Sequence, residues 1–187
     1  MRIISGKYKG RTIKMPKGIR PTQDKVRKAL FDILGNIEGL SFLELFAGSG
    51  AVGLEALSQG AKEAVFVEKD RKCTEKIKEN LSALGLVELP ACRQAGRVIE
   101  LDVFKAIEQL NNQGRKFDII FLDPPYYQEL AKKALQTLSA YDILAPNGFV
   151  IIQHFKKDSL PEALGDLRLF KQAKYGDSVL SFYRRLS

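Results

Sequence analysis

Histidine and cysteine are scarce in this chain. Its 187 residues include a single histidine, His154, and two cysteines, Cys73 and Cys92. They form no cluster with the spacing of metal ligands, so we predict neither a zinc site nor another metal centre. Two cysteines that lie far apart and follow no pattern do not indicate a disulfide framework. A reduced, cytoplasmic protein is therefore expected.

Long apolar runs are also missing. The longest are the length of a strand, which excludes a transmembrane helix, and we predict no membrane partner. The amino terminus is basic but has no apolar segment behind it, unlike a signal peptide. No repeat or low-complexity linker divides the chain, and its length fits one globular unit.

Positive charge is concentrated at the amino terminus. Residues 1–28 hold ten lysines and arginines against one acidic residue, a charge of +9, whereas the whole chain carries +8. Such an arm suits a polyanion, although a solvated charged surface is the simpler alternative. We predict a basic hairpin in 1–22, separate from a domain over 23–187. The candidate phosphate contacts are Lys7, Lys9, Arg11, Lys14, Arg20 and Arg27.

The rest of the sequence alternates strands with helices. Apolar strands are predicted at 41–46, 64–68, 97–102, 118–123 and 148–153, with helices at 51–58, 70–84, 103–113 and 127–140. An earlier helix, capped by Thr22 or Asp24, should end near Gly35. Two further strands fill 167–185, with a turn at 175–177. This alternation predicts an α/β fold with a mostly parallel sheet covered on both faces.

A glycine-rich loop follows the first strand. Gly48, Gly50 and Gly53 have the G-x-G-x-x-G spacing of dinucleotide-binding folds, and Glu68 follows at the distance of a ribose-binding acid. Glu44, at the end of the strand, would repel a pyrophosphate but would accept a hydrogen bond from an ammonium group. This favours S-adenosylmethionine as cofactor over a nicotinamide dinucleotide, which stays an alternative.

Each acidic residue here also has a plain structural interpretation. Glu44 could cap the helix after the loop, and Asp102 could cap the helix from Val103 rather than accept from the adenine amine. Val103 and Phe104 would flank the adenine ring.

The fourth predicted strand ends in Asp123-Pro124-Pro125-Tyr126. Two prolines remove two backbone donors and fix the loop, leaving one carboxylate and one aromatic ring. The Asp123 carboxylate and the Pro124 carbonyl suit the two N–H bonds of an exocyclic amine, and Tyr126 would stack on its ring. A tight turn with Asp123 as a helix cap is the structural alternative.

Five sequence stretches together resemble one known family. ELFAGSGAVGLEAL, FVEKD and LDPPY are similar to class I S-adenosylmethionine-dependent methyltransferases of exocyclic amines. MRIISGKYKGRTIKMP and RPTQDKVRKALFDIL resemble the bacterial 16S ribosomal RNA guanine-N2 methyltransferases. The chain departs from that family at Glu44, usually aspartate, and at Gln153-His154, where relatives often carry glutamate. Residues 85–97 match no motif.

The resemblance implies a Rossmann-like, seven-stranded sheet whose last strand is antiparallel. It implies methyl transfer from S-adenosylmethionine to N2 of a guanine in 16S rRNA, within an assembled or nearly assembled small subunit, by a single copy of the chain. Pro125 joins Asp123, Pro124 and Tyr126 as the catalytic loop. The expected cofactor-binding residues are Thr22, Glu44, Phe46, Ala47, Gly48, Ser49, Gly50, Glu68, Lys69, Asp102, Val103 and Asp123.

Three alternatives to this function stay open. The same loop would serve an adenine-N6 methyltransferase acting on DNA, although such enzymes carry a target-recognition domain that this chain lacks. The glycine loop would also serve a nicotinamide oxidoreductase. An RNA-binding assembly factor without catalysis would keep the basic arm but would not need Asp123.

Overall fold

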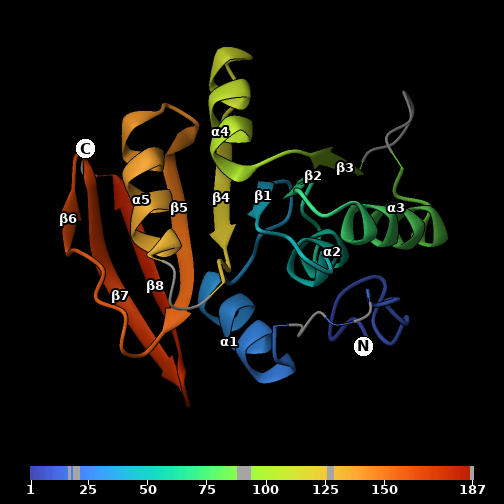
Figure 1. Ribbon diagram of the computed structural model, residues 1–187. Coiled ribbons are helices and arrows are strands. Elements are labelled where there is room, and N and C mark those ends of the chain that lie inside the picture. Colours follow the sequence, from blue (N-terminus) through green and yellow to red (C-terminus); the bar gives the residue numbers. More distant parts are fainter. Residues whose placement is uncertain (17, 19–21, 88–93, 126–128, 186–187) are drawn as a thin grey trace.

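The computed structural model describes residues 1–187 except 17, 19–21, 88–93, 126–128 and 186–187 (Figure 1). Within this part of the chain one sheet has the strand order β3-β2-β1-β4-β5-β8-β7-β6. The strands are β1 Ser41–Leu45, β2 Glu63–Glu68, β3 Ala95–Glu100, β4 Phe117–Leu122, β5 Leu144–Phe155, β6 Ala163–Leu164, β7 Leu167–Tyr175 and β8 Ser178–Arg185. The helices are α1 Asp24–Leu34, α2 Ala51–Ser58, α3 Arg71–Leu84, α4 Val103–Asn112 and α5 Leu130–Ala140.

The strand directions confirm the predicted fold class. β3, β2, β1, β4 and β5 pair in parallel, and β8 enters antiparallel between β5 and β7. The seven longer strands thus have the expected arrangement, with the last one antiparallel. The sheet nevertheless has eight strands, because the two-residue β6 pairs with the outer edge of β7.

Helices cover both faces of the sheet, as its apolar strands require. One core packs α1, α2 and α3 against side chains such as Phe42, Phe66 and Phe121. The second core packs α4 and α5 against the opposite face of the sheet. Its side chains include Leu43 and Val65, which lie next to Phe42 and Phe66 on the same strands. Because side chains alternate along a strand, residues in even and odd positions of β1 and β4 enter different cores.

The basic segment at the amino terminus is docked on the domain. Its two ends pair antiparallel, as a hairpin does, with a bridge between Arg2 and Thr12 and hydrogen bonds from the Ile3 N–H to the Arg11 carbonyl and from the Ile13 N–H to the Met1 carbonyl. Ile3 and Ile13 are buried in the core of α1 and α2. The backbone N–H groups of Ile4 and Ser5 each donate to the Glu55 carboxylate over 2.8 Å. The described part of the arm therefore shares a core with the domain.

Helix α1 corrects two predictions. Gln23 is its N-cap residue and makes no side-chain capping bond, so neither Thr22 nor Asp24 caps the helix. Arg27 is fully buried, which excludes it as a phosphate contact. Its Nε lies 3.4 Å from Oε2 of Glu55, and its Nη2 donates to the Arg2 carbonyl over 2.7 Å. It ties α1, α2 and the arm together.

The sheet changes winding direction between β1 and β4, which is where open α/β sheets bind ligands at the carboxyl ends of their strands. Leu122 of β4 pairs with Ile152 of β5, so the next residues, Asp123 and Gln153, face the same side of the sheet. That side is the one covered by α1. In the described ranges no helix has the length and apolar character needed to cross a membrane.

Candidate active site

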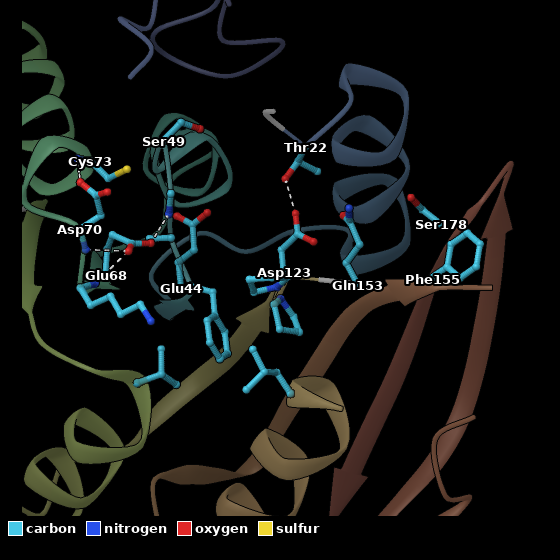
Figure 2. A pocket seen from close by; sticks show the side chains of 18 of the residues that line it. Thr22, Glu44, Ser49, Glu68, Asp70, Cys73, Asp123, Gln153, Phe155 and Ser178 are labelled. Atoms are coloured by element: carbon cyan, nitrogen blue, oxygen red, sulfur yellow. Dashed lines mark hydrogen bonds between the residues drawn. The ribbon is translucent and has the colours of Figure 1, made fainter. Parts of the chain in front are cut away.

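A cavity of about 990 Å³ opens at the carboxyl ends of β1, β2, β4 and β5. Figure 2 shows two groups of side chains around it. Glu44, Ser49, Glu68 and Asp70 lie on one side, which we call the acidic half. Thr22, Asp123, Gln153, Phe155 and Ser178 lie on the other, which we call the loop half. Its volume lies at the upper end of the range for small-molecule sites.

Glu44 is the buried carboxylate of the acidic half. Its Oε2 accepts a hydrogen bond from the Gly53 N–H over 2.8 Å, so the predicted capping role is present. Burial, with a smaller contribution from the charge of Asp123, raises the pKa of Glu44 to about 8 against the hydrogen bonds from Gly53 and Val52. Glu44 still lines the cavity. A cationic ligand there would favour the ionised carboxylate.

The glycine loop has few backbone donors left for a phosphate. Glu44 occupies the Gly53 N–H, and Oε2 of Glu68 accepts from the Gly48 N–H over 2.9 Å. A side chain at position 53 would meet Phe66 at 2.4 Å, so this glycine is needed for packing of α2 on the sheet. These contacts oppose a pyrophosphate, because carboxylates already take the amides that would bind it. They suit an uncharged ribose and a cation.

An apolar slot lies beside the acidic half. Phe46, Val103 and Phe104 line the cavity, and the rings of Phe46 and Phe104 meet edge to face with centroids 6.5 Å apart. Phe46 has a φ of 57°, a strained conformation for a residue other than glycine, of the kind found at functional sites. Asp102 caps α4 by accepting from the Phe104 N–H over 3.0 Å, and it also lines the cavity. This slot suits a planar apolar group.

Asp123 stands at the start of the loop half. Its Oδ2 accepts a hydrogen bond from the Thr22 hydroxyl over 3.0 Å. Burial raises its pKa to about 7, against the lowering effect of that bond. Pro124 and Pro125 line the cavity next to it. Tyr126, predicted to stack on a base, lies outside the described residues.

Gln153 brings an amide into the cavity wall from β5. Its side chain is only 4% exposed, and its Oε1 has no hydrogen-bond partner in the part of the chain that the structure describes. A buried acceptor without a partner costs about 1–3 kcal/mol, which a ligand donor would recover. Its neighbour His154 is held by Ser181 Oγ at 2.8 Å and by the Phe155 carbonyl at 3.0 Å. His154 is therefore structural.

The structure brings together most of the predicted cofactor-binding residues. Thr22, Glu44, Phe46, Ala47, Gly48, Ser49, Glu68, Lys69, Asp102, Val103 and Asp123 all line the cavity. Gly50 does not. It is the left-handed N-cap of α2, with φ of 71°, and a side chain there would meet Ile77 at 2.9 Å.

Other lining residues are not predicted from the sequence. They are Gly18, Gln23, Asp70, Cys73, Leu130, Phe155 and the turn at 175–178. The turn itself is predicted, but its place in the cavity wall depends on the insertion of β8 next to β5. No local pattern indicates that pairing.

The predicted RNA contacts in the arm differ in whether they also bond to the domain. Lys7, Lys9, Arg11 and Lys14 are exposed. Arg11 also donates to the Ala83 carbonyl over 3.1 Å, and Lys14 lies 3.5 Å from Glu79. Arg20 lies outside the described residues.

The fold, with its cavity at the switch point, is that of the class I methyltransferases. A solved structure of a hypothetical protein from Thermus thermophilus superposes with a TM-score of 0.83 at 36% identity, over 98% of this chain and 99% of that one. The Bacillus subtilis protein YlbH, named as a putative rRNA methyltransferase, is 36% identical over 99% of both chains. Ribosomal RNA small subunit methyltransferase D of Escherichia coli K12 is 32% identical, over 99% of this chain and 90% of its own length.

The family is also shown by a match along nearly the whole chain. Residues 1–184 fit the family described as Conserved hypothetical protein 95, and this chain belongs to it.

Proposed function

We propose that this protein transfers a methyl group from S-adenosylmethionine to the exocyclic N2 of a guanine in the RNA of the small ribosomal subunit. One observation carries the reaction type. A half-buried carboxylate, Asp123, faces a cavity whose opposite side is lined with acceptors for a cation. The substrate is supported by the relatives named for ribosomal RNA methylation.

The acidic half fits the cofactor. Glu44 would accept the ammonium group, Glu68 the ribose hydroxyls and Asp102 the adenine amine, with Val103 and Phe104 beside the ring. When bound, S-adenosylmethionine supplies an electrophilic methyl. The amine nitrogen would take the methyl group as the carbon–sulfur bond breaks, with that electron pair left on sulfur. The proton released by the amine would pass to solvent.

The loop half would orient the nucleophile. The nitrogen lone pair of guanine N2 is delocalised into the ring, so the amine must become more tetrahedral to react. Acceptors at both N–H bonds favour that shape, and we assign them to the Asp123 carboxylate and the Pro124 carbonyl. Tyr126 stays predicted to stack on the base. A stacked base cannot enter, so the target guanine must be flipped out or lie in a loop.

The proposal also covers the RNA partner and the number of chains that act together. The exposed arm residues Lys7, Lys9, Arg11 and Lys14 suit the phosphates of RNA. An assembled or nearly assembled small subunit stays the expected substrate, as the family resemblance implies. The described lining of the cavity comes from one copy of the chain, and the proposal takes one copy as the working enzyme.

Methyl transfer to small subunits from a strain that lacks this methyltransferase tests the proposal. Labelled S-adenosylmethionine and nucleoside analysis should yield N2-methylguanosine. N6-methyladenosine would contradict the substrate assignment, and tight binding of a nicotinamide dinucleotide without binding of S-adenosylhomocysteine would contradict the cofactor. Asp123→Ala should lower kcat by about 100-fold or more while binding of S-adenosylhomocysteine persists. Full activity of that variant would leave only an RNA-binding role.

A further inference from the structure

The loop half holds a polar group that the proposed reaction does not use. Gln153 is buried, lines the cavity, and has its Oε1 without a partner among the described residues. Ile152 of β5 pairs with Leu122 of β4, and these strands are parallel neighbours. Gln153 directly follows Ile152, and Asp123 directly follows Leu122. The backbones of Asp123 and Gln153 therefore lie on neighbouring strands, which are spaced about 4.8 Å apart. Figure 2 shows both side chains extending to the same side.

We propose that Gln153 reads the Watson–Crick edge of the target guanine and determines the specificity of the enzyme for that base. This inference rests on the proposed function, since it takes the amine at Asp123 to be guanine N2. Gln153 Oε1 accepts a hydrogen bond from guanine N1–H, and Nε2 donates to guanine O6. Recognition of flipped bases commonly uses this edge.

The order of groups along the base favours guanine. Guanine presents N2–H, N1–H and O6 in one row, which matches Asp123 followed by the two ends of an amide. Adenine presents its amine, a bare N1 acceptor and a C2–H. With its amine at Asp123, adenine leaves Oε1 facing a lone pair, and after an amide flip it leaves Oε1 facing carbon. One polar group stays unmatched in either orientation, which strongly disfavours the wrong base.

Two neighbouring polar side chains, His154 and Thr22, do not supply this contact. His154, the next residue on β5, points away from the cavity and is engaged by Ser181. Thr22 is a donor whose hydroxyl is directed to Asp123. Gln153 thus provides an acceptor in the loop half that carries no charge, as a neutral purine requires.

Small subunits reconstituted with guanine or 2-aminopurine at the target position provide the test. 2-Aminopurine keeps the amine but has no N1–H and no O6. We expect the wild-type protein to prefer guanine by about 10- to 100-fold in kcat/KM. Gln153→Met should lower kcat/KM for guanine by a similar factor. It should leave kcat/KM for 2-aminopurine within about threefold of the wild-type value, so that the preference for guanine disappears. Equal use of both bases by the wild type would overturn the inference.

Three further measurements separate the ways in which the test can fail. Gln109→Met makes the same change at an exposed position of α4, outside the cavity, and should behave as wild type. Gln153→Glu keeps the acceptor for N1–H and should retain a preference for guanine even if Gln153→Met does not fold. Binding of S-adenosylhomocysteine should change less than about twofold in Gln153→Met, and a larger loss would place Gln153 in the cofactor site instead.

If the wild type methylates no guanine, the proposed function fails. If it does and Gln153→Met keeps the preference, only this inference fails.

Discussion

The Thr22 hydroxyl donates a hydrogen bond to Oδ2 of Asp123 over 3.0 Å, across 101 residues of sequence. This bond connects the segment before α1 to the loop after β4. It stabilises the ionised form of a carboxylate whose pKa burial has raised to about 7. It also occupies an oxygen that we assign to the amine. Thr22 therefore has to be displaced, or to share that oxygen, when a base binds.

Removing this hydroxyl should shift the pH dependence of methyl transfer. In Thr22→Val the pKa of Asp123 should rise by up to about one unit, because a donor to the carboxylate is lost. The ionised carboxylate is the active form, so kcat/KM should fall up to tenfold near pH 6 and change little near pH 9. Thr137→Val, whose hydroxyl bonds only to the Lys133 carbonyl, is the matched control. A loss that is equal at every pH would point to a structural role.

Binding of S-adenosylhomocysteine should strengthen with pH. Glu44, with a pKa of about 8, is mostly protonated at neutral pH, and an ammonium ligand needs its carboxylate. The association constant should therefore rise by up to tenfold per pH unit below 8 and then level off. Calorimetry of Glu44→Gln should give weaker binding with a flat pH profile, whereas exposed Glu162→Gln should follow the wild type. An unchanged slope in Glu44→Gln would assign the titration to another group.

Arg27 should matter for stability rather than for RNA contact. Arg27→Met removes the cation from a buried pair with Glu55 and leaves that carboxylate uncompensated. We expect a loss of about 3–5 kcal/mol in the free energy of unfolding, measured with urea. Lys28→Met, at an exposed pair with Asp32, should cost less than about 1 kcal/mol. Equal losses in the two variants would contradict the interpretation of the buried pair.

Exposed lysines of the arm should determine the salt dependence of RNA binding. Replacing Lys7 and Lys9 with glutamine should reduce the slope of log K against log salt by about 0.7–0.9 for each phosphate that the protein no longer neutralises. Lys105→Gln with Lys132→Gln removes the same charge from the helices on the opposite face of the sheet. That double variant should keep the wild-type slope. Similar slopes in both double variants would mean that the arm acts only through net charge.

Local patterns predict the parts of the fold and site that depend on neighbours in the sequence. The helix predicted at 51–58 has those bounds in the structure, because glycines and a strand end mark it on both sides. Glu44, Glu68 and Asp123 are predictable because each ends a strand, and parallel strands bring such ends together. Gln153 stands out in the sequence only as a departure from the family, since its burial and unmatched oxygen depend on packing.

Long-range packing explains the errors. Arg27 is predicted to lie on the surface because basic residues usually do, but its partner Glu55 lies on another helix. The arm is predicted to be separate from the domain, whereas in the structure it is docked there. Its charge pattern gives no sign of the backbone bonds from Ile4 and Ser5 to the same carboxylate.

The insertion of β8 between β5 and β7 has a consequence for biosynthesis. The cavity takes Thr22 from one end of the chain and Ser178, at the start of β8, from the other. During translation the interval between these residues lasts roughly 10–30 s. Until β8 pairs with β5, the nascent chain has its glycine loop and acidic half but an incomplete loop half. The ribosome that makes this protein is thus exposed to the basic arm well before it is exposed to a complete active site.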